Sequence, residues 1–157
     1  MNRQSAIVES WLRAALAVYG ESMAALAARE GDPFRNPVGS RLRAQLGELA
    51  AELLGGMDGA AIERCLVEIV AVSAVQYLTP APALEFVFAA RRIVPEVAPE
   101  LAPVDLEARV DRLALVAFGQ YLRLRTRMAE LRLEEHRRGL GPLPYRLRQP
   151  PPAAADG

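Results

Sequence analysis

The fold is decided by residues 104–138, which read VDLEARVDRLALVAFGQYLRLRTRMAELRLEEHRR. Apolar side chains recur here in steps of three and four residues, the spacing of one face of an α-helix. These positions are Leu106, Val110, Leu113, Ala117, Tyr121, Leu124, Met128 and Leu131. At 1.5 Å per residue, roughly 35 residues span about 50 Å, which exceeds the width of a small domain. The sequence therefore predicts a long last helix, part of which extends beyond the core.

The two halves of this predicted helix differ in composition. The first half has a second apolar line, Leu115, Phe118 and Leu122, so we expect a core around residues 106–122. Beyond Arg123, most positions off the main line are Arg or Glu, which is typical of a narrow two-helix seam. We predict a dimer and partner surface there, formed by Leu124, Arg127, Met128, Leu131, Arg132, Glu134 and Arg138. The alternative is a solvated face with a Glu134–Arg138 ion pair.

Helical apolar patterns and turn residues predict four more helices upstream. The first runs from Ala6 to Leu26, the second from Pro37 to Gly55-Gly56, the third from an Asp58 cap, and the fourth from Thr79-Pro80 to the prolines 95, 99 and 103. The fold class is therefore all-α, a five-helix bundle with a long C-terminal helix. We expect one folded domain over residues 1–138 and a proline-rich, disordered tail over residues 139–157.

The composition of the chain limits the classes of binding partner and the cellular compartment that we expect. The chain has 157 residues, and its 19 basic side chains, all Arg, balance 19 acidic ones. Zero net charge favours neither nucleic acid nor anionic lipid, so we predict no nucleic-acid partner. No apolar stretch approaches the length of a membrane span, so no membrane insertion is expected. The lone Cys65 allows no internal disulfide, which fits a cytoplasmic protein.

Residues suited to catalysis or metal binding are scarce. The single histidine, His136, lies on the polar part of the last helix, so a histidine-based metal site or triad is excluded. Cys65 is interpreted as a core filler, with a redox sensor as the alternative. Glu85 is the only acid nominated as inward-facing for an enzyme. We predict no catalytic, cofactor-binding or metal-binding residues, and therefore a protein that is not an enzyme.

A small-molecule receptor is the alternative function. Aromatic side chains from several predicted helices could line an apolar pocket for a small ligand, as binding sites often do. These residues are Trp11, Tyr77, Phe86, Phe88 and Phe118. Packing in the core is the competing interpretation of the same five residues.

Five segments of the chain resemble a known family, the N-terminal domain of the RsbRD group. The segments are DPFRNPVG (32–39), AVQ (74–76), TPAPALEFVF (79–88), EARVDRLALVAF (107–118) and AELRLEEHRR (129–138). Members of the group are co-antagonists of RsbT in bacterial stress signalling. The resemblance covers about residues 6–138. The chain departs from the family pattern at Ser73, Tyr77 and Ala81-Pro82, where the family carries Arg, Asp and Ser-Gln.

The resemblance implies a dimeric sensory domain with a globin-like fold that lacks haem. In the family, the last helix leads to a C-terminal STAS domain, and the sensory domain regulates a kinase-binding scaffold without catalysing a reaction. We expect a stand-alone form here, without a STAS domain. The sequence thus predicts a non-catalytic sensor or adaptor in bacterial stress or regulatory signalling, which forms a homodimer and binds partner proteins through its last helix.

Overall fold

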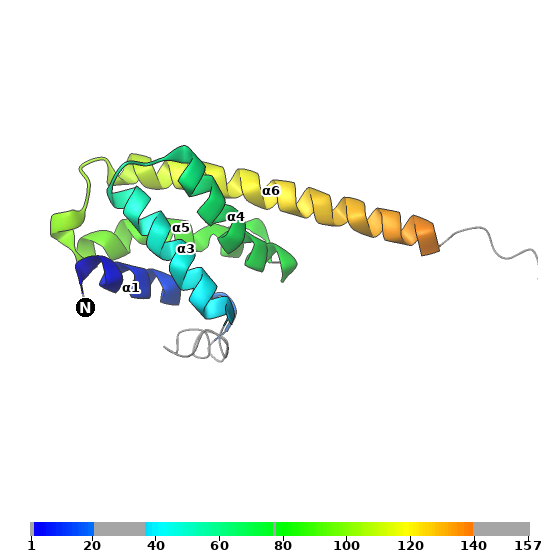
Figure 1. The fold of residues 1–157 in the computed structure, drawn as a ribbon, viewed down its shortest axis with the longest axis horizontal. Coiled ribbons are helices and arrows are strands. Elements are labelled where there is room, and N and C mark those ends of the chain that lie inside the picture. The colour runs from blue at the N-terminus through cyan, green and yellow to red at the C-terminus, as the bar shows by residue number, and fades with distance from the viewer. Residues whose placement is uncertain (1, 21–36, 77, 140–157) are drawn as a thin grey trace, which may run out of the picture. The chain divides into compact units, whose positions relative to one another are not determined.

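The computed structural model describes residues 2–20, 37–76 and 78–139, and these residues form helices without any strand. The helices are α1 (Arg3–Ala17), α3 (Pro37–Leu54), α4 (Gly59–Val75), α5 (Pro80–Val97) and α6 (Leu106–Gly139), with a short 3₁₀ turn, η1 (Pro99–Leu101) (Figure 1). The all-α prediction with a long last helix is confirmed. The chain divides into two compact units, residues 1–125 and 126–157, each described separately below.

Local capping signals account for most helix starts. The Asn2 side chain accepts a hydrogen bond from the Ser5 amide (3.1 Å), and the Asp58 side chain accepts one from the Ala60 amide (2.9 Å). Both bonds satisfy amides that the first turn of a helix leaves unpaired. Thr79 precedes Pro80 at the first position of α5, where proline loses no helical hydrogen bond. The predicted starts at Asp58 and Thr79-Pro80 are confirmed.

Three helix ends differ from the prediction. α1 ends at Ala17, because the chain turns through Gly20 with a φ of +88° that other residues rarely adopt. Residues 21–36, which include the predicted end of this helix at Leu26, lie outside the described part. Pro95 does not end α5, which continues to Val97, since in a last turn proline removes only one hydrogen bond. α6 begins at Leu106 rather than Val104.

The first unit has a continuous apolar core built around α1. This helix packs against α3 and α5, and α3 packs against α4; in Figure 1, α1 and α5 run alongside each other. The indole of Trp11 is buried and donates a hydrogen bond to the Phe86 carbonyl (2.7 Å), so its polar atom is satisfied. Arg43 of α3 pairs with Glu9 of α1 at 2.6 Å.

A corner of residues 52–58 connects α3 to α4. The amides of Gly55 and Met57 donate to the Glu52 carbonyl (3.2 and 3.1 Å), which ends α3. Met57 has a φ of +56°, in the left-handed region that commonly follows a helix. The Glu52 carboxylate then accepts a hydrogen bond from the Asp58 amide (2.7 Å). The predicted stop at Gly55-Gly56 is therefore confirmed.

Arg109 of α6 attaches the start of the last helix to this corner. Its guanidinium donates to the carbonyls of Leu53 (3.0 Å) and Gly55 (2.7 Å) and pairs with Asp105 (2.7 Å). The Leu53 carbonyl lies in the last turn of α3, where carbonyls lack a helical partner, and the Gly55 carbonyl follows directly after the helix. One side chain therefore satisfies the end of α3 and fixes the first turn of α6.

Candidate protein-interaction surface

The first half of α6 carries one buried row of apolar side chains. The row belongs to the core of the first unit, and its members are Leu106, Val110, Leu113, Ala117 and Tyr121. At its end, the Tyr121 hydroxyl donates a hydrogen bond to the Leu78 carbonyl. These positions were predicted as core, and their burial confirms that prediction.

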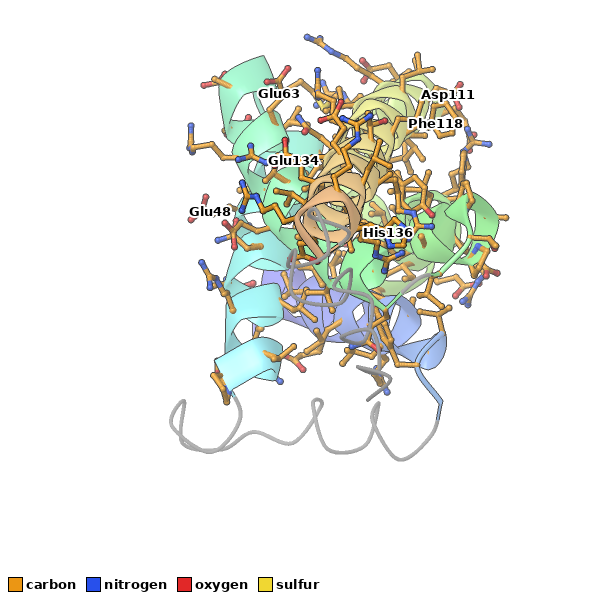
Figure 2. All side chains as sticks on the ribbon, turned by 90° about the vertical axis from the view of Figure 1, so that its right-hand side faces the viewer. Glu48, Glu63, Asp111, Phe118, Glu134 and His136 are labelled. Carbon is orange, nitrogen blue, oxygen red and sulfur yellow. The ribbon has the colours of Figure 1, made fainter. Side chains whose placement is uncertain are left out.

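A second apolar row on the same part of α6 is exposed. Leu115, Phe118 and Leu122 are 74%, 44% and 47% exposed, so their predicted place in the core is wrong. The described helices of the first unit cover the buried row and leave this other side of α6 open. Figure 2 shows Phe118 and Asp111 on one side of the unit, with Glu48 and Glu63 on the opposite side. We call Leu115, Phe118 and Leu122 the exposed row.

Gly119 lies beside the exposed row, in the middle of a helix. Glycine there costs about 1 kcal/mol relative to alanine. A Cβ atom built on Gly119 meets only the Arg123 guanidinium, at 3.9 Å, so packing within the unit does not require glycine at this position. The absence of a side chain does leave room for a second backbone to approach, as small residues do where helices pack closely.

Arg91 of α5 forms one border of the exposed row. Its guanidinium pairs with Glu107 (2.9 Å) and with Asp111, one turn before Leu115. It also lies 5.3 Å from the centre of the Phe88 ring, a cation–π contact. The Phe88 side chain is 46% exposed. The apolar surface around the exposed row thus has a charged edge, in which Arg91 pairs with both acids.

The predicted dimer and partner surface lies mostly in the second unit. Within Thr126–Gly139 no residue is buried, and Arg127, Arg132, Glu134 and Arg138 are exposed. Leu131 and Leu133 are each about half exposed, and Leu133 was missed because it lies off the predicted line. Glu134 and Arg138 form the predicted ion pair at 3.8 Å. Leu124, half-buried, belongs to the first unit.

The four described residues of the predicted aromatic pocket lie in different environments. Trp11 and Phe86 are buried in the core, whereas Phe88 and Phe118 are exposed. Phe86 also borders a hollow of about 360 Å³ between α1 and α5, with Ala14, Val18 and Pro82. Tyr77 lies outside the described residues. A pocket shared by all five residues therefore stays a prediction.

Cys65 and Glu85 were the remaining candidates for a chemically reactive side chain. Cys65 is fully buried, with its Sγ 3.6 Å from Glu48 Oε2. Burial, and then the Glu48 carboxylate, raises the pKa of this thiol to about 11. A protonated thiol is a poor nucleophile, which favours the core-filler interpretation. Glu85 is exposed, so its nomination as an inward-facing acid is wrong.

Metal and membrane features were sought in the same described residues. No group of three or more His, Cys, Asp and Glu side chains there is placed to hold a metal ion. His136 is exposed, as predicted. In residues 2–20, 37–76 and 78–139, no helix has the length and apolar character needed to cross a membrane.

Comparison of the chain with protein-family models, with curated proteins and with solved structures finds no match.

Proposed function

We propose that this chain is a non-catalytic sensory or adaptor domain that forms a homodimer and binds partner proteins through α6. The observation that carries the proposal is the exposed row, an apolar strip on a helix whose opposite side is already packed. Contiguous exposed apolar surface marks interaction sites more often than scattered single residues do. Leu131 and Leu133 of the second unit add apolar surface flanked by Arg and Glu.

The small area of the exposed row limits the binding free energy that it can contribute. Full burial of a Leu or Phe side chain contributes about 1.5–3 kcal/mol, and Leu115, Phe118 and Leu122 are already partly covered. Association costs at least about 4 kcal/mol in lost freedom of motion. The exposed row alone is therefore a weak interface, and we propose that the second unit adds contacts of its own to the dimer. The Arg side chains of the second unit then serve as anchors for partner carboxylates.

The resemblance to the RsbRD group gives this proposal its biological setting. Under it, the chain works in bacterial stress or regulatory signalling in the cytoplasm, and its fold is related to globins without haem. The protonated, buried Cys65 and the exposed His136 and Glu85 support a non-catalytic role, because neither a nucleophile nor an enclosed acid–base pair is formed by them.

The dimer can be tested by light scattering and sedimentation of the full chain at about 50 µM, where an interface with micromolar Kd is mostly assembled. We expect a dimer, and we expect Leu115→Glu combined with Leu122→Glu to weaken it at least tenfold. Val104→Glu is the matched control, because Val104 is fully exposed outside α6. A monomeric wild-type protein, or a dimer that tolerates the double substitution as well as the control, would refute the proposal.

Partner binding is tested separately, by capture from a bacterial host with the full chain and with a chain ending at Arg125. The second unit begins at Thr126, so the shorter chain keeps the whole first unit. We expect the chain ending at Arg125 to capture none of the partners that the full chain captures. Equal capture by both chains would place partner binding outside the second unit.

A further inference from the structure

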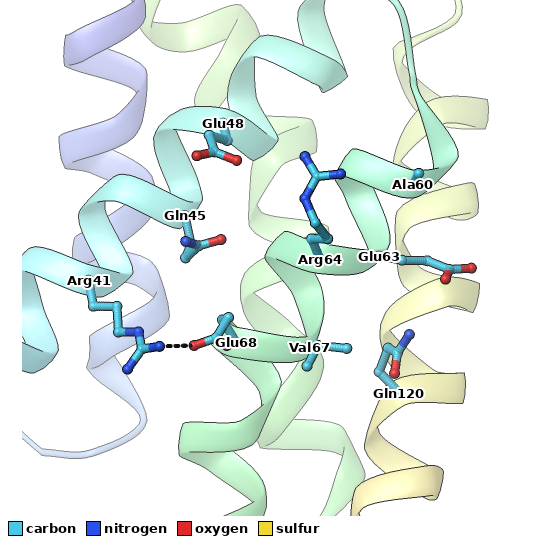
Figure 3. Close-up of a pocket in the computed structure, with 9 residues that line it drawn as sticks. All are labelled: Arg41, Gln45, Glu48, Ala60, Glu63, Arg64, Val67, Glu68 and Gln120. Carbon is cyan, nitrogen blue, oxygen red and sulfur yellow. Dashed lines mark ion pairs between the residues drawn. The ribbon is translucent and has the colours of Figure 1, made fainter.

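A polar cleft lies between α3 and α4 on the side of the first unit away from the exposed row. Its volume is about 720 Å³, within the range of small-molecule sites. It is lined by Arg41, Gln45 and Glu48 of α3, by Ala60, Glu63, Arg64, Val67 and Glu68 of α4, and by Gln120 of α6 (Figure 3). None of these residues belongs to the predicted pocket or to the predicted dimer surface.

Gln120 is the feature that distinguishes this cleft from a solvated groove. Its side chain is only 7% exposed, and it occupies the side of α6 where the neighbouring Ala117 and Tyr121 are core residues. Figure 3 shows it reaching from α6 toward Val67 and Glu63. Its amide makes no hydrogen bond with any described residue, and it lines the cleft. Arg91 Nε is the one fully buried side-chain polar atom without a hydrogen bond among the described residues, so the Gln120 amide stays accessible, and a polar ligand in the cleft could supply its hydrogen bonds.

The charged side chains of the cleft differ in whether they have an ion-pair partner. Arg41 and Glu68 form an ion pair at 3.0 Å and compensate each other. Glu48 accepts only the long contact from the Cys65 thiol. Among the described residues, Glu63 and Arg64 have no ion-pair partner within 4.0 Å. Two carboxylates and one guanidinium, from Glu48, Glu63 and Arg64, are therefore available to a ligand.

We propose that this cleft binds a free dibasic amino acid. Such a ligand carries two cationic groups and one carboxylate, the complement of the two acids and the one guanidinium. The carboxylate of the ligand pairs with Arg64, and its two cationic groups reach Glu48 and Glu63. The amides of Gln45 and Gln120 supply both donors and acceptors for its remaining polar atoms. This inference stands independently of the dimer proposed above.

The direct test is titration calorimetry of the full chain with four probes: L-lysine, L-arginine, cadaverine and L-glutamate. We expect L-lysine or L-arginine to bind with a Kd of about 1 mM or tighter, as a ligand of this size allows. Cadaverine has two cationic groups but no carboxylate, so it should bind at least tenfold more weakly. L-Glutamate should not bind. Absence of binding by both dibasic amino acids, or tighter binding of L-glutamate, would overturn the proposal.

Substitutions locate the site. Glu63→Gln should weaken L-lysine binding about tenfold through loss of a charge-assisted contact, whereas Glu85→Gln, an exposed acid on α5, is the matched control and should have no effect. Arg64→Gln should reduce the affinity for L-lysine to that for cadaverine. Gln120→Leu should abolish binding while the unfolding temperature stays equal or rises. Equal binding by the Glu63→Gln and Glu85→Gln proteins would overturn the assignment, even if Gln120→Leu failed to fold.

Discussion

The two apolar rows on the first half of α6 have similar compositions and opposite environments. Leu113 in one row is fully buried, whereas Leu115 in the other is 74% exposed, although only one residue separates them. Helical periodicity recognises both rows as apolar, but whether a row is covered depends on which other helices pack there. A second row that no described helix covers is therefore better support for the proposed partner chain than the overall length of the helix.

The most severe way to test this comparison is to truncate one leucine from each row. Leu113→Ala should lower the free energy of unfolding by about 2–5 kcal/mol, because it leaves a cavity in a packed core. Leu115→Ala should change it by less than about 1 kcal/mol in the monomer, since the side chain is already in water. Urea unfolding at a concentration below dimer formation measures both. Similar losses for the two variants would mean that the exposed row is covered within the monomer.

A second pair of substitutions compares two arginines of α6, Arg109 with hydrogen bonds to the corner and the exposed Arg112. Arg109→Gln should lower the free energy of unfolding by about 1.5–3 kcal/mol, since the guanidinium satisfies two carbonyls at the end of α3. Arg112→Gln, an exposed position one turn later, should have little effect. Thermal unfolding with and without salt measures both changes. If Arg112→Gln lowered the free energy of unfolding as much as Arg109→Gln, the hydrogen bonds to the two carbonyls would not have the stabilising role proposed for them.

The smallest effect is expected at Gly119. Gly119→Ala should stabilise the monomer by about 0.5–1 kcal/mol, because alanine favours helix and nothing rigid blocks its Cβ. Gly47→Ala in α3 is the matched control, with no atom within 4 Å of the new Cβ. Both should raise the unfolding temperature, but only Gly119→Ala should weaken the dimer by sedimentation. Equal dimer affinity in the two variants would show that the helices do not approach each other closely at Gly119.

Features fixed by neighbouring residues could be predicted from the sequence. The Asp58 cap, Thr79-Pro80 and Gly55-Gly56 act within a few residues, and each ends or starts a helix where the pattern indicates. The exposure of Leu115 could not be predicted, since it depends on how the described helices pack around α6 and not on the local sequence. The prediction that Pro95 ends α5 was wrong, because the free-energy cost of a proline in a helix depends on its distance from the helix end.

The α3–α4 cleft was also missed at the level of sequence. Glu48, Glu63 and Arg64 are exposed charged residues of two different helices, and only folding brings α3 beside α4. One signal was present: Gln120 is a polar residue three positions after Ala117 and next to Tyr121, on the side of the predicted helix that faces the core. A polar residue at such a position indicates either a hydrogen-bond partner in the core or a site that opens there.

The corner at residues 52–58 has a consequence for how the protein opens locally. The end of α3, the start of α4 and the first turn of α6 all depend on hydrogen bonds made there by Glu52, Asp58 and Arg109. Since breaking the corner releases three helix ends together, the amide hydrogens of Gly55, Met57, Asp58 and Ala60 should show one common free energy of opening in hydrogen exchange.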